Sequence, residues 1–215
     1  MTIRSKLYAA TAVTVAGLAL TAGVGIWGMA RLAVRFDHVQ TAGDARALAL
    51  QLKFGVTDFN GWQTAYGYDN GRSRRIFLAS VAAFRADLAR ARERLTRPVE
   101  RRSLAEISGA FADFMRLDAR AFAALRAGRT AEVRRLFLGP EITNFERAAA
   151  GAQRLATYEE AHAALQERTF RSARRDALRY LIGASIIAGV LVAILLGTAN
   201  DLARRAEDAL GQSGT

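Results

Sequence analysis

The stretch Asp58–Asp69 reads Asp-Phe-Asn-Gly-Trp-Gln-Thr-Ala-Tyr-Gly-Tyr-Asp and holds one of the chain's two tryptophans and two of its five tyrosines. It ends a stripe of residues spaced alternately four and three apart: Leu48, Leu52, Gly55, Phe59, Trp62 and Tyr66. That spacing is typical of a helix with one side packed against a partner. The aromatic side chains of this stripe therefore belong to the core of a helix bundle or, as the alternative, line a sensing site.

The composition favours an all-α chain that is stable without disulfides. The 215 residues include no Cys and two Pro, and the net charge is +11. Lys6 and Lys53 are the lysines, so arginine supplies nearly all of the positive charge. The arginines mostly alternate with acidic residues, as in Arg90-Ala-Arg92-Glu93-Arg94, which indicates solvated helix faces. We expect no nucleic-acid partner, because no basic stretch is interleaved with exposed aromatic residues.

Two uncharged runs frame the chain: Leu7–Ala30, of 24 residues, and Tyr180–Asn200, of 21 residues. At about 1.5 Å per residue, each is long enough to cross a hydrocarbon core of about 30 Å. A cleaved signal peptide is the alternative for the first run, but its apolar part exceeds the usual length of about 7–15 residues. We expect a cytoplasmic N-terminus at 1–6, transmembrane helices at 7–30 and 180–200, an extracytoplasmic domain at 31–179 and a cytoplasmic tail at 201–215.

The central segment reads as four long helices. Asn70-Gly71 predicts the turn that ends the first one. Apolar stripes mark the second helix, at about 74–95, and the third: Phe77, Val81, Phe84, Leu88, Ala91 and Leu95, then Leu104, Ile107, Phe111, Met115, Asp118, Phe122 and Leu125. Ser103-Leu-Ala-Glu106 predicts a capping box that opens the third helix. A short helix is expected at 131–138, and Gly139-Pro140 predicts the first turn of the fourth.

These lengths predict an up-down-up-down four-helix bundle on a helical stalk continuous with two transmembrane helices. Residues 31–70 and 140–179 would each span roughly 60 Å at about 1.5 Å per residue, whereas the second helix would span about 33 Å. The lower part would be a two-helix coiled-coil stalk, which favours a homodimer that covers its apolar face. The second membrane run carries a face of small residues suited to membrane helix packing in such a dimer: Ser185, Gly189, Ala193 and Gly197. Packing between the two runs of one chain is the alternative.

The sequence carries no pattern that we can assign to catalysis or to a bound cofactor. Glu159-x-x-His162 matches half of a di-iron signature, but the second half is missing because Arg35 occupies the required position before His38. No phosphate loop, Gly-x-Ser-x-Gly sequence or Cys nucleophile is present. We therefore expect the protein not to be an enzyme and to have neither a metal nor a cofactor.

Asp118 is the acidic residue on an otherwise apolar stripe, and a buried charge needs a partner. Counting residues along the helices places it near Tyr66 and Asn144. It is either a satisfied polar group of the core or part of a small polar pocket at the membrane-distal end. The candidate ligand-binding residues are Asn60, Trp62, Gln63, Tyr66, Asp69, Asp118 and Asn144.

Asp58–Asp69, together with Leu136-Phe-Leu-Gly-Pro-Glu-Ile142 and Phe145-Glu146, resembles the sensor region of methyl-accepting chemotaxis receptors. That region is a four-helix-bundle ligand-binding module between two membrane spans, and the resemblance covers residues 4–202. It implies a chemoreceptor-like sensor in the inner (plasma) membrane of a bacterium. Such a sensor binds a small-molecule ligand outside the cytoplasm and relays the binding signal through the membrane helices. The resemblance, more than the charge distribution, places both termini in the cytoplasm.

Asp201–Thr215 are too few residues for a HAMP linker or a signalling domain. We therefore expect any chemotaxis signal to pass to another chain, possible partners being full-length chemoreceptors. The alternative function is that of a structural or interaction protein. It would be either a bundle scaffold in an envelope complex or a pairing partner for full-length receptors.

Overall fold

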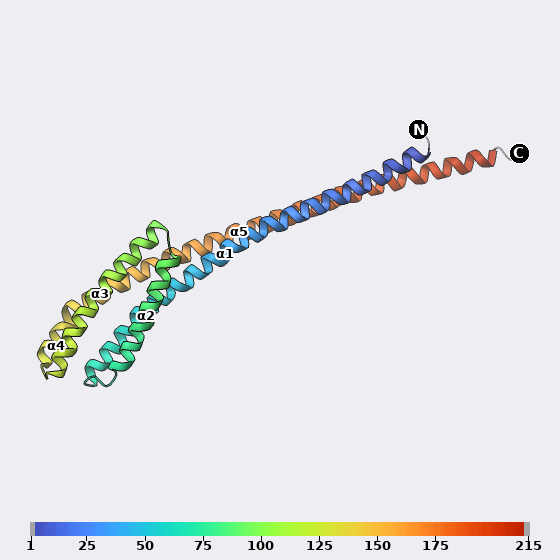
Figure 1. The fold of residues 1–215 in the computed structure, drawn as a ribbon. Coiled ribbons are helices and arrows are strands. Elements are labelled where there is room, and N and C mark those ends of the chain that lie inside the picture. Colours follow the sequence, from blue (N-terminus) through green and yellow to red (C-terminus); the bar gives the residue numbers. More distant parts are fainter. Residues whose placement is uncertain (1–2, 213–215) are drawn as a thin grey trace. The chain divides into compact units, whose positions relative to one another are not determined.

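The computed structural model describes residues 3–212, apart from side chains near both ends, and every described element is helical. Figure 1 shows α1 (Ile3–Tyr68), α2 (Arg74–Arg94), α3 (Pro98–Arg126), α4 (Thr130–Leu136) and α5 (Ile142–Gln212). A short kinked segment, η1 (Phe137–Glu141), joins α4 to α5. The all-α prediction is confirmed. The outermost residues of the two expected cytoplasmic segments, 1–2 and 213–215, lie outside the described residues.

The chain divides into two compact units. The helical domain comprises His38–Gln166. The paired-helix unit comprises Met1–Asp37 and Glu167–Thr215, and so contains both of the uncharged runs.

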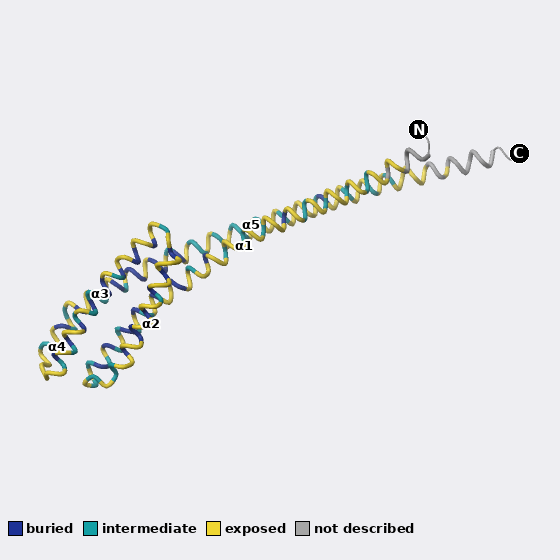
Figure 2. Tube along the Cα trace, viewed as in Figure 1, coloured by how far each residue is buried: buried dark blue, intermediate teal, exposed yellow. Residues whose placement is uncertain are grey.

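One hydrophobic core joins α1, α2, α3 and α5 in the helical domain, and Figure 2 shows its buried positions recurring along these helices. Every residue of the stripe predicted for α2 is buried. At the centre, the ring of Phe59 lies 5.1 Å from that of Phe84, 5.3 Å from that of Phe111 and 5.0 Å from that of Phe114, between centroids. Each such aromatic pair adds about 0.5–1.5 kcal/mol to the stabilisation from burial.

The buried face of α1 differs slightly from the predicted stripe. Phe59 and Tyr66 are fully buried as expected, but Val56 and Gln63 are buried where the stripe has the adjacent Gly55 and Trp62. Trp62 is half-buried at the edge of the core. A polar side chain, Gln63, therefore occupies a core position that the apolar pattern does not reveal.

The helix boundaries confirm one predicted signal and contradict another. The α1–α2 turn lies at Asn70-Gly71, with φ values of 55° and 90°. The predicted capping box of α3 is wrong, because the helix begins at Pro98 and the backbone N–H of Arg97 donates to Glu100 Oε2 at 2.7 Å. Pro is favoured at a first helical position, where its missing N–H costs nothing.

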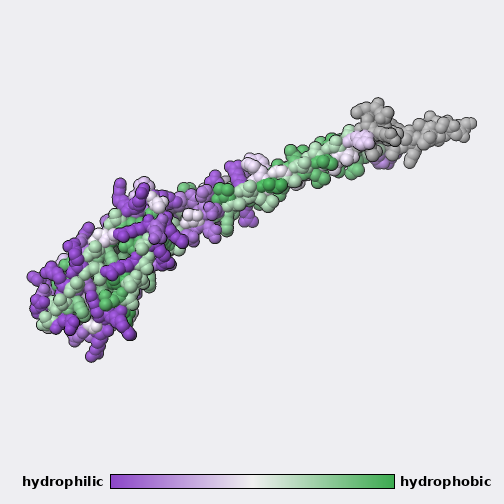
Figure 3. Space-filling model, in the orientation of Figure 1, coloured by the Kyte–Doolittle hydropathy of each residue, from purple (hydrophilic) through white to green (hydrophobic). Residues whose placement is uncertain are grey.

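The two uncharged runs lie in the paired-helix unit, where the start of α1 and the last part of α5 run side by side (Figure 1). The ring of Trp27 lies 6.4 Å from that of Tyr180, edge to face. By length and composition, both helices contain segments that could cross a membrane, and 6% of each segment is buried within the protein. The core helix of a soluble protein would be mostly buried. Along this pair of helices, by contrast, Figure 3 shows apolar residues at the surface.

The contact between these two segments does not use the predicted small-residue face. Ser185, Gly189, Ala193 and Gly197 are all exposed. A different face of α5 meets α1: a Cβ placed on Gly17 would lie 3.6 Å from Ala188 Cβ, and one placed on Gly28 would lie 3.6 Å from Ala177 Cβ. Packing between the runs of one chain therefore leaves the small-residue face exposed, with Gly189 at the edge of a groove that Val13 and Gly17 of α1 also line.

Candidate ligand-binding site

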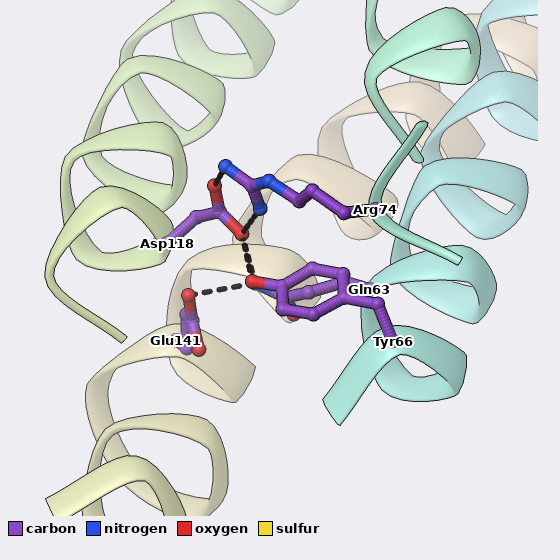
Figure 4. Close-up of polar contacts among 5 residues, drawn as sticks. All are labelled: Gln63, Tyr66, Arg74, Asp118 and Glu141. Carbon is purple, nitrogen blue, oxygen red and sulfur yellow. Dashed lines mark hydrogen bonds and ion pairs between the residues drawn. The ribbon is translucent and has the colours of Figure 1, made fainter. Parts of the chain in front are cut away.

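A buried polar cluster joins four elements of the helical domain near the α1–α2 turn (Figure 4). Its members are Gln63 and Tyr66 of α1, Arg74 of α2, Asp118 of α3 and Glu141 of η1. The exposed fractions of Gln63, Tyr66, Asp118 and Glu141 are 4%, 0%, 0% and 1%. Polar groups this deep in a core need partners, since burying one without a hydrogen bond is costly.

Asp118 is the centre of the cluster. Its carboxylate forms a bidentate pair with Arg74, with Nη1 2.7 Å from Oδ1 and Nη2 2.7 Å from Oδ2. Tyr66 donates its hydroxyl to Oδ1, and Gln63 Nε2 donates to the same atom at 3.3 Å. The predicted proximity of Asp118 and Tyr66 is thus confirmed. Burial raises the pKa of Tyr66, and the charge and hydrogen bond of Asp118 raise it further, so the hydroxyl remains a donor.

Arg74 is held by aromatic rings as well as by Asp118. Its guanidinium carbon lies 4.8 Å from the ring centroid of Tyr66, 4.7 Å from that of Phe77 and 4.4 Å from that of Phe122. Cations are attracted to the faces of such rings, more strongly where water is excluded. Burial alone would lower the pKa of Arg74, but the hydrogen bond and charge of Asp118 outweigh it and the net shift is upward.

The α1–α2 turn fixes the position of Arg74 at the start of α2. Asp69 Oδ2 accepts hydrogen bonds from the backbone N–H of Ser73, at 2.9 Å, and from its hydroxyl, at 2.5 Å. Arg74 then lies three residues before Phe77, on the same side of α2. Asp69, predicted as a ligand-binding residue, therefore positions the helix that carries Arg74.

Glu141 enters the cluster because the chain is kinked. Gly139 has the non-helical angles φ −118° and ψ −106° within η1, next to Pro140. Glu141 Oε1 accepts from Gln63 Nε2 at 2.7 Å, and Oε2 is buried without a hydrogen-bond partner. Burial raises the pKa of Glu141 to about 8, and the charge of Asp118 adds to this, while Gln63 and Arg74 oppose it. The carboxyl is therefore mostly protonated at neutral pH.

A pocket of about 410 Å³ adjoins the cluster, and Gln63 belongs to both. It is lined by Asn60, Gln63, Thr64, Gly67, Tyr68, Asn70, Leu125, Thr130, Val133, Arg134, Phe137, Leu138, Ile142 and Phe145. Small-molecule sites are of this kind, about 300–1,000 Å³ with apolar walls and a few polar groups. Gly67 has a steric role, since a Cβ there would lie 2.4 Å from Phe137 Cε2.

The remaining predicted residues are divided between this pocket and other roles. Asn60 lines the pocket with Gln63, whereas Trp62 packs against the core and is not part of the lining. Asn144 lies outside the cluster: its Nδ2 donates to the carbonyl of Pro140 at 2.9 Å, and its Oδ1 accepts from Arg147 Nη1 at 3.1 Å. Glu141 takes the place expected for Asn144.

Arg74 and Glu141 are not among the predicted residues, although the sequence carries a signal for each. Arg74 continues the α2 stripe one turn before Phe77. Glu141, the last residue of η1, lies four residues before Phe145 and seven before Ala148, which belong to the buried side of α5. A charged residue at a core position interrupts the apolar pattern. It is recognised as buried only when the helical spacing of the apolar residues is continued across it.

A second cluster of buried acids lies where α3 begins. The exposed fractions of Glu100 and Glu159 are 2% and 0%, and Arg97 Nη1 lies 3.2 Å from Glu100 Oε1 and 3.8 Å from Glu159 Oε2. Burial, then the hydrogen bond and charge of Glu100, raise the pKa of Glu159 to about 7. Arg97 Nη2 is 2.8 Å from His162 Nε2, and burial and the charge of Arg97 lower the pKa of that histidine.

No group of three or more potential metal ligands of the His, Cys, Asp and Glu types is found among the described residues. Comparisons with models of protein families, with curated proteins and with solved structures find no match to the chain. Its function must therefore be inferred from the chemistry of its own residues.

Proposed function

We propose that the chain is a membrane-anchored sensor module. In this proposal the helical domain is an up-down-up-down four-helix bundle on the extracytoplasmic side of a bacterial inner membrane. It binds a small molecule in the pocket beside the polar cluster and relays binding through the two membrane helices. The resemblance to chemotaxis receptors makes chemotaxis-type signal transduction the expected output.

One observation carries the proposal: the two helices that contain the apolar segments also line the pocket. Asn60 and Gln63 belong to α1, and Ile142 and Phe145 belong to α5. A ligand that changes the packing of these side chains acts directly on both helices, which are the elements a membrane relay would use. A protein that served only as a spacer would have no need for a pocket next to a buried charged network.

Ligand screening on the full chain in lipid nanodiscs tests the binding part of this proposal. A thermal-shift screen should find compounds that raise the melting temperature, because a ligand that binds only the folded state stabilises it. Leu138→Trp, at an exposed residue of the pocket lining, should abolish the shift. Leu78→Trp is the matched control, since Leu78 is exposed on α2 away from the pocket. Equal responses of the two variants would disprove the assignment of the pocket.

The orientation is tested by cysteine labelling in intact cells. An impermeant reagent should label a cysteine at Arg129, in the expected extracytoplasmic domain, and spare one at Ser213. Labelling at Ser213 alone would reverse the orientation and refute an extracytoplasmic sensor.

A second candidate function, pairing in the membrane as an interaction protein, is favoured by the open small-residue face of α5. Small residues every four positions let two helices approach closely in lipid. Gly189→Cys should form a disulfide between two copies in native membranes, whereas Ala188→Cys, on the face that meets α1, should not. Similar crosslinking of both positions, or of neither, would rule out a homodimer built on this face. An envelope scaffold or a partner of full-length receptors would use the same surface.

A further inference from the structure

The polar floor of the pocket presents hydrogen-bond acceptors. The amide nitrogen of Gln63 has two protons, and both are used: one reaches Glu141 Oε1 at 2.7 Å and the other Asp118 Oδ1 at 3.3 Å. Asp118 fixes the orientation of the amide, because its carboxylate, which is paired with Arg74, accepts and does not donate. Gln63 Oε1 is then the atom of this side chain that is left to face the pocket.

A neighbouring side chain adds to this acceptor character. The hydroxyl of Thr64 donates its proton to the backbone carbonyl of Asn60 at 3.0 Å, which leaves the lone pairs of its oxygen for a ligand. Both residues line the pocket beside Gln63. A ligand that donates hydrogen bonds therefore suits this floor better than one that accepts them.

The charges behind the floor favour a cation. Arg74 neutralises Asp118, so the ionisation of Glu141 would give the cluster a net negative charge. The side-chain amide of Gln63 lies between that charge and the pocket. The groups that face Glu141 are Tyr66 and Gln63 from α1, Arg74 from α2 and Asp118 from α3. On α4, Arg134 lines the pocket, but it is exposed, so solvent and salt screen its charge.

Much of the pocket wall is apolar. Val133 is buried, and Phe137, Ile142 and Phe145 also line the pocket. Such a wall suits a hydrocarbon body of a few carbon atoms rather than a polar one.

We propose that the pocket binds a small organic cation, in which an ammonium group sits on an apolar body and donates a hydrogen bond to Gln63 Oε1. This inference rests on the proposed sensor function and specifies the chemical class of its ligand. The bound positive charge favours the ionised form of Glu141, so the carboxyl releases its proton to the solvent as the cation enters.

Three probes with the same branched five-carbon skeleton separate the contribution of the head group. Isoamylammonium, isoamyl alcohol and isovalerate carry a cationic donor, a neutral donor and an anionic acceptor. Calorimetric titration of the full chain in nanodiscs, with empty nanodiscs subtracted, gives each affinity. We expect the ammonium to bind about tenfold or more tightly than the alcohol, since charge-assisted hydrogen bonds are roughly twice as strong as neutral ones, and no binding of isovalerate.

A matched pair of variants places the cation in the pocket. Thr64 and Thr57 are both exposed on α1, and both donate their hydroxyl to the carbonyl four residues earlier. Thr64→Arg puts a positive charge in the pocket and should abolish ammonium binding, whereas Thr57→Arg adds the same charge outside the lining and should leave it unchanged. Equal loss in both variants would mean that the cation binds elsewhere.

Proton release distinguishes the role of Glu141. Titrations at about pH 7 in phosphate and in Tris should differ in heat because binding releases a proton from Glu141, and Glu141→Gln should remove the difference. Tighter binding of the alcohol or of isovalerate, blocked by Leu138→Trp, would overturn the ligand class while the pocket remained a binding site. Binding of none of the probes would also overturn the proposed class, whereas the proposed function fails only if the wider thermal-shift screen finds no pocket ligand.

Discussion

Removal of the Arg74 guanidinium tests whether the polar cluster holds the helical domain together. Arg74→Met keeps an apolar stem of similar length against the rings of Tyr66, Phe77 and Phe122 but leaves Asp118, which is fully buried, without its cation. Removing one partner of a buried ion pair costs about 3–5 kcal/mol, because the remaining charge is uncompensated. Tyr66 and Gln63 still donate to Asp118, so we expect a loss within that range rather than above it.

The assay can follow the helical domain alone. The chain has two tryptophans, Trp27 in the paired-helix unit and Trp62 at the edge of the core. In a Trp27→Phe background, the fluorescence of Trp62 reports the unfolding of the helical domain by urea in nanodiscs. The free energy of unfolding is then compared between the background protein and the Arg74→Met variant.

A second substitution separates charge from packing. Asp118→Asn removes the buried charge and keeps an oxygen that accepts from Tyr66. The double variant Arg74→Met/Asp118→Asn should therefore recover about 2 kcal/mol relative to Arg74→Met alone, which is within the usual range of coupling energies for contacting residues. A loss below about 1 kcal/mol in the single variant, or strictly additive losses in the double variant, would refute the view that the ion pair is the critical contact.

Two further outcomes follow from the same region. The folded-state pKa of Glu141, about 8, lies above its ordinary value of 4.5, so the folded protein keeps a proton that the unfolded chain releases. Stability should fall between about pH 4.5 and 8, by up to about 1.4 kcal/mol per pH unit, and urea unfolding of Glu141→Gln should show a shallower decline. Gly67→Ala, whose Cβ would lie 2.4 Å from a ring carbon of Phe137, should destabilise the domain by about 1–3 kcal/mol. Gly61→Ala, with open space around its Cβ, should stabilise it by about 0.5–1 kcal/mol, and equal melting temperatures of the two variants would contradict this packing.

The sequence predicts best those helices whose buried faces are wholly apolar. The stripe of α2 is buried at every predicted residue, and the Asn70-Gly71 turn lies where its glycine and asparagine indicate. The start of α3 was misplaced because two signals compete there. Pro98 at the first helical position and Glu100 as a capping partner override the similar pattern at Ser103.

The buried face of η1 and α5 was harder to predict because acids occupy it. Glu141 and Glu159 are both buried, whereas Leu138 and Ile142 are 72% and 43% exposed. A prediction based on apolar residues therefore selects Leu138 and Ile142, which lie near the buried Glu141 in the sequence, and leaves out the buried acid itself. The kink at Gly139 adds a second difficulty, since no helical periodicity can be carried through a residue with non-helical φ and ψ.

The hydrogen bonds of Gln63 have a consequence for how this protein can change during evolution. A glutamate at position 63 would have nearly the same shape, yet it would remove both donated protons and place a third carboxyl against those of Asp118 and Glu141. Like charges so close disfavour ionisation. Position 63 is thus tied to two acids that are 55 and 78 residues away along the chain. In descendants of this sequence, we expect these three positions to be retained or exchanged together.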